Sequence, residues 1–167
     1  MNSPYHATGM MPGTGPPDSR HNVGAPNVKD DKKLQLIARV PIFARLRGRD
    51  LERVGQLVEE IDVPAGKVLM RQGETGHEFF LIVDGRVRVE RDGRVLKNRS
   101  AGEFVGEIAL IDEGPRSATV TCETPCRLLV LGHREFHTLL GEHPDLQLLV
   151  LKTLAERVRH LEPEPID

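Results

Sequence analysis

The chain has 167 residues, with 23 Lys and Arg, 25 Asp and Glu, and a formal net charge of −2 at pH 7. This length fits one domain with a modest core plus tails. The nearly balanced charge gives no indication of a nucleic-acid or membrane partner. The sequence has no run of about 18 apolar residues and no charged-then-apolar signal peptide, which predicts a soluble, cytoplasmic protein.

The first part of the chain differs in composition from the rest. Residues 1–28 are rich in proline and glycine and have almost no apolar periodicity. Such a segment cannot bury enough surface to offset the entropy that ordering removes. We therefore expect a disordered tail over 1–28, a folded domain over 29–162 and a short tail over 163–167. A docking role for the first tail remains an alternative to that of a flexible linker.

Two helices are expected at the start of the domain. An apolar helical stripe begins at Leu34 and is interrupted at Pro41, because a proline biases the preceding residue away from helical angles. Asp50 is a good N-cap for the second helix. The apolar face of that second helix is expected to hold Leu51, Val54, Leu57, Val58 and Ile61.

The middle of the chain predicts short strands separated by turns. The strands are expected at 68–70, 79–83, 87–89, 95–96, 117–123 and 127–131. The pairs Asp84-Gly85 and Asp92-Gly93 are strong hairpin signals. Many short strands at hairpin spacing predict an α+β fold, built on a small antiparallel β-barrel or jelly roll with flanking N-terminal helices.

The last third returns to a helical pattern. One helix is expected over 133–140, ended by Gly141, and Pro144 with Asp145 starts another. Packing against the core is the simplest role for the apolar stripe of the last helix. That stripe consists of Leu146, Leu149, Val150, Thr153, Leu154, Val158 and Leu161.

The stretch 104–120, here called the cassette, reads FVGEIALIDEGPRSATV, and its residue types indicate a chemical role more than a packing role. Gly106 leaves room for a ligand to approach closely, and a run of good helix formers starts at Glu107. The first amides of a helix have no intrahelical partner, so Ile108 and Ala109 are candidate N–H donors to an anion. Phosphate is the natural ligand.

Three further side chains of the cassette indicate which class of ligand it binds. Arg116 is suited to bidentate phosphate contact, and Ser117 adds a hydroxyl. A carboxylate beside a phosphate site is repelled by it unless it has another task, and Glu107 is suited to accept hydrogen bonds from a sugar hydroxyl. A 3′,5′-cyclic nucleotide carries both an anionic phosphate and a free 2′-hydroxyl. An alternative is that Glu107 and Arg116 pair with each other in a scaffold that binds nothing.

The cassette resembles the phosphate-binding cassette of the cyclic nucleotide-binding domain family, which typically reads F-G-E-[IL]-A-L, a short gap and P-R-x-A-T-V. The one departure is Val105. A weaker resemblance extends over 34–161. The resemblance of the cassette implies that Glu107 binds the ribose 2′-hydroxyl. The ligand-binding set that we expect is Gly106, Glu107, Ile108, Ala109, Arg116, Ser117 and Ala118.

In the family, the helix that corresponds to 144–161 closes over the base as a lid and often carries dimer contacts. The resemblance therefore implies two roles for this helix, a lid and a homodimer contact. Arg157 is the candidate lid residue, stacked on a purine, and the alternative is an exposed arginine.

The resemblance implies a regulatory sensor that signals to an unidentified effector protein. Cyclic AMP is the expected ligand and cyclic GMP the alternative, because Ser117 offers a hydroxyl that reaches either phosphate or a guanine. No DNA-binding unit is expected in this chain, which ends at Asp167. The sequence has no phosphate loop, no G-x-S-x-G and no G-x-G-x-x-G, so we expect no enzyme and no cofactor. The rival function is a non-binding structural or interaction module of the same fold.

Two cysteines and two histidines form the remaining pattern of interest. Cys122, Cys126, His133 and His137 resemble a four-ligand zinc set, but the gap between the pairs is short for a finger and falls on a predicted strand. We expect no metal site here. Buried thiols and surface imidazoles explain these residues, and a reducing cytosol disfavours a disulfide between the cysteines.

Overall fold

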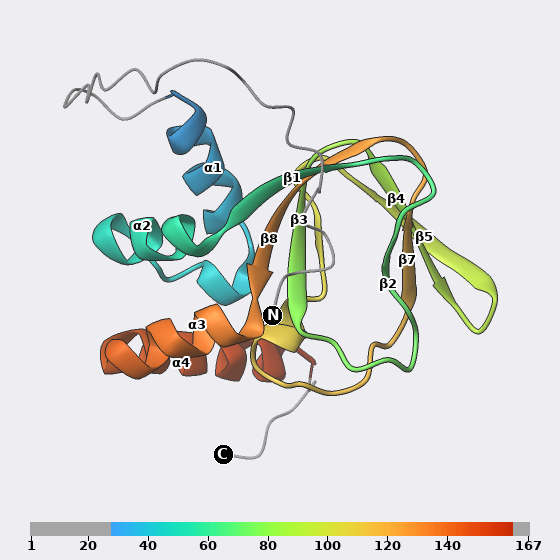
Figure 1. Ribbon diagram of the computed structural model, residues 1–167. Helices are drawn as coiled ribbons and strands as arrows, with labels where there is room; N and C mark the ends of the chain where they lie inside the picture. The colour runs from blue at the N-terminus through green and yellow to red at the C-terminus, as the bar shows by residue number, and fades with distance from the viewer. Residues whose placement is uncertain (1–27, 162–167) are drawn as a thin grey trace.

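The computed structural model describes residues 28–161, in which two four-stranded antiparallel sheets lie beside a group of helices (Figure 1). One sheet has the order β1-β8-β3-β6 and the other β2-β7-β4-β5. This confirms the predicted fold class, an antiparallel jelly roll with flanking helices and a C-terminal helix. The expected tails at 1–28 and 163–167 lie outside the described residues, apart from Val28, where α1 begins.

Alternating side chains of the strands build the core between the two sheets. Phe80, Ile82, Val87 and Leu128 are fully buried there, whereas Phe79 points to the opposite side of its strand. The first sheet comprises β1 (Glu59–Val63), β8 (Cys126–Gly132), β3 (Glu78–Asp84) and β6 (Phe104–Val105). The second comprises β2 (Val68–Met70), β7 (Thr119–Cys122), β4 (Arg86–Arg91) and β5 (Arg94–Ser100).

A second core joins the helices to the outer face of the first sheet. The Phe43 ring meets Phe79 and Phe136 edge to face, with ring centroids 6.1 and 5.6 Å apart. Each buried ring of this kind contributes about 1.5–3 kcal/mol. The helices are α1 (Val28–Ala38), η1 (Pro41–Phe43), α2 (Gly48–Leu57), α3 (His133–Glu142) and α4 (Pro144–Leu161).

The second helix differs from the prediction at both ends. It begins at Gly48, so Asp50 lies in its first turn and is not the N-cap, which is Arg47. It ends at Leu57, and Ile61 belongs to β1, a strand that the sequence did not predict. The helical spacing of Ile61 was misleading because β1 pairs with β8 along its whole length, and this pairing determines the local structure.

Only one of the two predicted Asp-Gly hairpins forms. Asp92 and Gly93 both have positive φ and connect the paired strands β4 and β5, as predicted. The hairpin predicted at Asp84-Gly85 was wrong, because this pair connects β3 of one sheet to β4 of the other. Gly85 has φ +101°, and a Cβ there would lie 2.6 Å from the Pro125 carbonyl oxygen. This glycine makes the crossing between the sheets possible.

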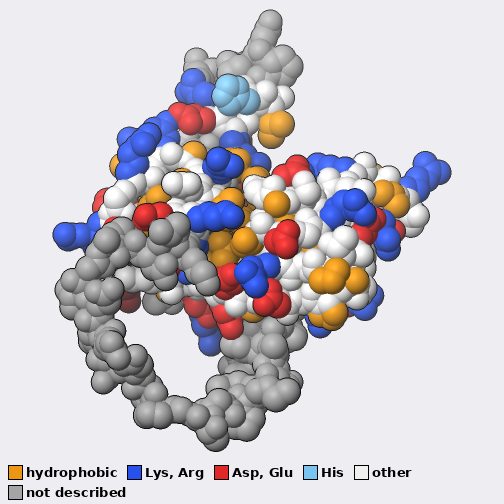
Figure 2. Space-filling model, turned by 90° about the horizontal axis from the view of Figure 1, so that it is seen from above, with side chains coloured by type: hydrophobic (Ala, Val, Ile, Leu, Met, Phe, Trp, Pro, Cys, Tyr) orange, Lys and Arg blue, Asp and Glu red, His pale blue; other side chains and the backbone are white. Residues whose placement is uncertain are grey.

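The end of the first C-terminal helix also differs from the prediction. α3 continues through Gly141 to Glu142, and the His143 amide donates to the Leu139 carbonyl oxygen at 3.1 Å. Pro144 begins α4, as predicted. None of the helices within 28–161 has both the length and the apolar character needed to cross a membrane. Seen from above, basic and acidic side chains are interspersed over the described surface (Figure 2).

Candidate functional site

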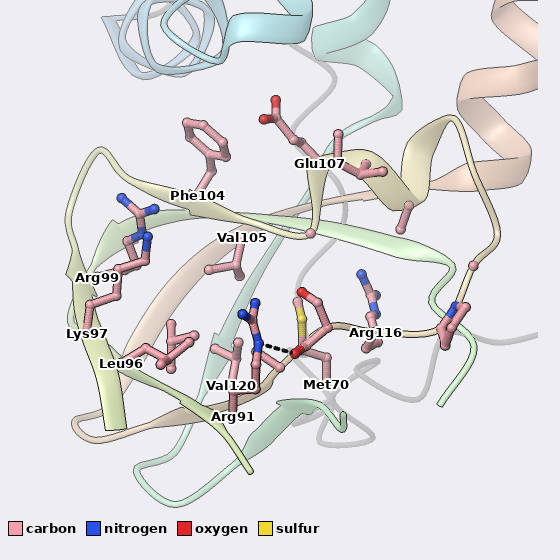
Figure 3. A pocket seen from close by; sticks show the side chains of 18 of the residues that line it. Met70, Arg91, Leu96, Lys97, Arg99, Phe104, Val105, Glu107, Arg116 and Val120 are labelled. Atoms are coloured by element: carbon pink, nitrogen blue, oxygen red, sulfur yellow. Dashed lines mark hydrogen bonds between the residues drawn. The ribbon is translucent and has the colours of Figure 1, made fainter. Parts of the chain in front are cut away.

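A cavity of about 500 Å³ lies between the cassette and the second sheet (Figure 3). This volume is in the range of small-molecule sites. Apolar walls come from Met70, Val89, Leu96, Phe104, Val105 and Val120. The structure brings the seven predicted ligand-binding residues together around this cavity: Gly106, Glu107, Ile108, Ala109, Arg116, Ser117 and Ala118. Arg157 does not line it.

Gly106 fixes the entrance of the cassette helix. It has φ +81° and is the N-cap of η2 (Glu107–Leu110), which begins at the predicted residue but is a 3-10 helix. A Cβ at Gly106 would lie 2.7 Å from Arg116 Nη1 and 3.0 Å from the Glu78 carbonyl oxygen. Both the backbone angle and the close approach therefore require glycine here. The prediction of a free Ala109 amide was wrong, because in this 3-10 turn it donates to the Gly106 carbonyl oxygen at 3.1 Å.

Arg116 is held in position by the start of β3 and by the loop that precedes it. Its Nη2 donates to the Glu78 carbonyl oxygen at 2.6 Å, and its backbone amide donates to the Glu74 carbonyl oxygen at 2.8 Å. A Cβ at Gly76 would clash with the guanidinium, so this glycine leaves room for it. The guanidinium is thus oriented before any ligand arrives. The sequence predicted only a turn at 73–76. The contact of Gly76 with Arg116 could not be predicted, because only the tertiary fold brings the two residues together.

Glu107 lies in a different environment from that of Arg116. Its side chain points to the helical side of the cassette, away from Arg116 (Figure 3), and the residue is 6% exposed. Its Oε1 lies 2.7 Å from Nη1 of Arg157 on α4. Burial raises the pKa of Glu107, although the Arg157 charge opposes this rise. Its predicted contact with a ribose hydroxyl stays a prediction.

Three further cations line the cavity and were not predicted. Arg91 of β4 and Lys97 and Arg99 of β5 contribute to its walls (Figure 3). Arg91 Nε donates to the Ser117 carbonyl oxygen at 2.9 Å. Together with Arg116 they make a cavity that attracts an anion. Strand periodicity alone gave no signal for these residues, since charged side chains on a strand usually face solvent.

Two histidines connect α3 to the cassette helix. His133 Nδ1 lies 2.8 Å from the Ala109 carbonyl oxygen, and His137 Nε2 lies 2.9 Å from that of Leu110. A carbonyl oxygen only accepts, so both ring nitrogens carry hydrogen. The rings are stacked with centroids 3.9 Å apart. The expectation of surface imidazoles was wrong for His133, whose side chain is 13% exposed.

The two cysteines lie in the core between the sheets. Cys122 and Cys126 are both free and buried, and burial raises the pKa of the Cys122 thiol to about 12. Such a thiol stays protonated and is a poor metal ligand. Within residues 28–161, no group of three or more His, Cys, Asp or Glu side chains is placed to hold a metal ion.

Comparison with known proteins identifies what this fold and site resemble. The sequence profile described as Cyclic nucleotide-binding domain matches residues 60–143. A cyclic nucleotide-gated potassium channel of Rhizobium etli is 40% identical over 123 residues, which are 74% of this chain and 34% of the channel. A cAMP-dependent protein kinase regulatory subunit of Neurospora crassa is 30% identical over 134 residues, 79% of this chain and 33% of that subunit. The chain thus spans about a third of the length of these relatives.

Solved structures show the same architecture. The N-terminal domain of a transcriptional regulator from Streptomyces coelicolor matches with a TM-score of 0.67 and 31% identity, covering 75% of this chain and 92% of that one. The regulatory domain of Toxoplasma gondii PKA, in complex with cAMP, matches with a TM-score of 0.63 and 28% identity, covering 70% and 46%.

Proposed function

The chain belongs to the cyclic nucleotide-binding domain family and is a cyclic nucleotide-binding regulatory domain, and from this premise we propose that its ligand is cyclic AMP. The cyclic phosphate binds at Arg116 and the first amides of η2. The base extends along the apolar walls toward β4 and β5, and the ribose lies between the base and the phosphate, on the side of Glu107. Two relatives with cAMP in their names or descriptions support this choice of nucleotide.

The observation that carries the proposal is the geometry around Arg116. A half-buried cation is held by the Glu78 carbonyl oxygen, beside a left-handed Gly106 that starts a helix, in a cavity of about 500 Å³. Helix amides and a guanidinium that converge in this way are a site for phosphate. The rival function, a non-binding module of the same fold, does not require this arrangement.

Calorimetric titration of the full chain with cyclic AMP tests the proposal. We expect saturable binding of one nucleotide per chain. Titration with 5′-AMP is the control, because the cavity is proposed to accept a cyclic diester with one negative charge. Absence of heat and of any thermal stabilisation at millimolar cyclic AMP would favour the non-binding module.

The base preference is part of the proposal. The Ser117 carbonyl oxygen is engaged by Arg91, and its hydroxyl is a weaker reader of a guanine than the restrained hydroxyl of threonine would be. We propose a modest preference for cyclic AMP over cyclic GMP, within about two orders of magnitude, since one neutral hydrogen bond is worth about 1 kcal/mol.

We propose that the domain acts as a sensor of the nucleotide and does not catalyse a reaction on it. Relatives named as a channel, a kinase regulatory subunit and a transcriptional regulator share this domain with different outputs. We propose that ligand binding moves α4 and thereby signals to an effector protein that the chain does not identify. The predicted stacking of Arg157 on the purine belongs to this movement.

A homodimer through α4 completes the proposal. Leu148, Leu151 and Val158 are 53%, 61% and 52% exposed, and they fall at the a and d positions of one heptad pattern. Sedimentation of the wild type and of Leu151→Lys tests this contact. We expect a dimer that the substitution dissociates, and a wild type that stays monomeric at high concentration would contradict it.

A further inference from the structure

One histidine at the start of α3 contacts both halves of the proposed phosphate site. His133 is the first residue of α3, and η2 lies against it (Figure 1). Its Nδ1 donates to the Ala109 carbonyl oxygen of η2 at 2.8 Å, and its backbone amide donates to the His77 carbonyl oxygen at 2.7 Å. The segment 74–78 also accepts hydrogen bonds from Nη2 and the backbone amide of Arg116. His133 therefore connects the helix and the arginine of that site.

The partners of the His133 ring require hydrogen on both of its nitrogens. Nδ1 faces the Ala109 carbonyl oxygen, which only accepts. Nε2 lies 3.1 Å from Oε1 of Glu113, and an ionised carboxylate also only accepts. A neutral imidazole would turn a lone pair toward that carboxylate. An imidazole is a stronger base than a carboxylate, so the additional proton belongs to the ring, and the contact with Glu113 forms when His133 is an imidazolium.

Two other histidines lie near this contact. The His137 ring stacks on that of His133 with centroids 3.9 Å apart, so a second imidazolium there would be repelled. His137 needs only one hydrogen, because its Nε2 faces the Leu110 carbonyl oxygen. His77 Nδ1 lies 3.9 Å from the same Glu113 oxygen, which is too far for a hydrogen bond. The geometry thus favours one positive charge, on the His133 ring.

The elements packed on α3 bring no further ion pair to the His133 ring within residues 28–161. These elements are α2, α4, β8 and η2. The charged residue of η2, Glu107, pairs with Arg157. No charged side chain of α2, α4 or β8 forms an ion pair with His133. The charge on this ring is therefore governed by Glu113 and His137.

Glu113 belongs to the turn 112–116, which connects η2 to Arg116. Its side chain is 56% exposed and that of His133 is 13% exposed, so the carboxylate is the partner that moves away when the ring loses its proton. The turn then keeps its backbone contacts with the loop before β3, such as the Gly76 amide donating to the Gly114 carbonyl oxygen at 3.3 Å. A looser turn has to be ordered when a ligand binds, and this ordering lowers the affinity.

We propose that His133 is a positioning residue of the phosphate site, and that its imidazolium holds the turn 112–116 through Glu113, so that cyclic nucleotide affinity falls as pH rises. This inference rests on the proposed function, because it needs a nucleotide bound at the cassette. The contact is complete at the acid end of the window in which histidine titrates, between about pH 5 and about pH 8, and is lost as the pH rises through it. By linkage, nucleotide binding takes up part of a proton in this window.

The test measures cyclic AMP affinity of the full chain at about pH 6 and about pH 8, on either side of the histidine titration. The proteins are the wild type, His133→Asn and the matched control His143→Asn. Asparagine keeps an N–H donor for the Ala109 carbonyl oxygen but does not titrate. We expect the wild type to bind roughly two- to fivefold more weakly at the higher pH, the effect of a partly exposed ion pair. His133→Asn should bind equally at both pH values. His143→Asn should keep the wild-type ratio, because the His143 side chain forms no hydrogen bond or ion pair with any described residue.

Glu113→Gln separates positioning from simple attraction between the imidazolium and the phosphate. This exposed substitution leaves His133 able to titrate but removes the carboxylate, so the pH dependence should flatten as it does in His133→Asn. Calorimetry in buffers of different ionisation enthalpy should show proton uptake near neutral pH for the wild type and less for both variants. If His133→Asn is poorly folded, Glu113→Gln alone decides.

Two kinds of failure are distinguishable. Wild-type binding that does not depend on pH, or a pH dependence that Glu113→Gln or a folded His133→Asn retains, overturns the role of His133. Failure of the wild type to bind cyclic AMP at either pH overturns the proposed function itself.

Discussion

Replacing Arg116 by alanine is the most direct perturbation of the site. The guanidinium lies beside the start of η2, and its Nη2 donates to the Glu78 carbonyl oxygen at 2.6 Å. A charge-assisted contact of this kind is worth about 1.5–3 kcal/mol. Each 1.4 kcal/mol is a tenfold change in affinity, so we expect cyclic AMP affinity to fall roughly ten- to a hundredfold or more.

The same substitution should change the stability of the free protein little. The substitution removes the hydrogen bond to the Glu78 oxygen, worth about 1 kcal/mol, but the Arg116 charge also lies in a cavity where Arg91, Lys97 and Arg99 outnumber the acids Glu107 and Asp112. Removing one of several like charges offsets part of the loss. The melting temperature without ligand should therefore stay within a few degrees of the wild type.

Calorimetric titration and thermal melting of Arg116→Ala check both expectations. Arg94→Ala is the matched control, because Arg94 is exposed in β5 and does not line the cavity. The control should bind as the wild type does. An unchanged dissociation constant for Arg116→Ala would refute the assignment of the phosphate to this arginine.

The other predictions follow from single residues. Glu107→Gln should shrink the discrimination between cyclic AMP and 2′-deoxy cyclic AMP several-fold, because a neutral amide is a weaker acceptor, and equal binding of both ligands by the wild type would contradict this role. Cyclic AMP should bind more tightly than cyclic GMP; tighter cyclic GMP binding that Ser117→Ala abolishes would show that the serine reads the base. Gly85→Ala should destabilise the fold by about 2 kcal/mol or more in denaturant titration, since φ is +101° and the space is filled, whereas Gly141→Ala, with nothing within 4 Å, should not destabilise it. Burial raises the pKa of Cys122 from 9.0 to about 12, so the folded state binds more protons than the unfolded state in this window. Stability should consequently fall as pH rises from about 9 to about 12, and Cys122→Ala should flatten that fall; equal slopes would argue against the buried thiol.

The local chemistry of the cassette could be determined from the sequence alone. The residues expected to contact the ligand lie within 106–118, so their spacing already indicated a glycine entrance, a short helix and an arginine. The Asp92-Gly93 turn was predictable for the same reason, since two positive φ angles are a local property of the residues. The fold class followed from strand spacing and turn residues. These features depend on residues that are neighbours in the chain.

Only the tertiary structure decided which partners the charged residues find. The sequence placed Glu107 beside a sugar, whereas the fold places it against Arg157 of α4. Local patterns likewise concealed β1, because its strand pairing with β8 is formed between distant segments. The physical reason is that burial and ion pairing depend on which elements pack together, and packing is a property of the whole domain. The ion pair of Glu107 with α4 is therefore set by helix packing and not by the cassette sequence.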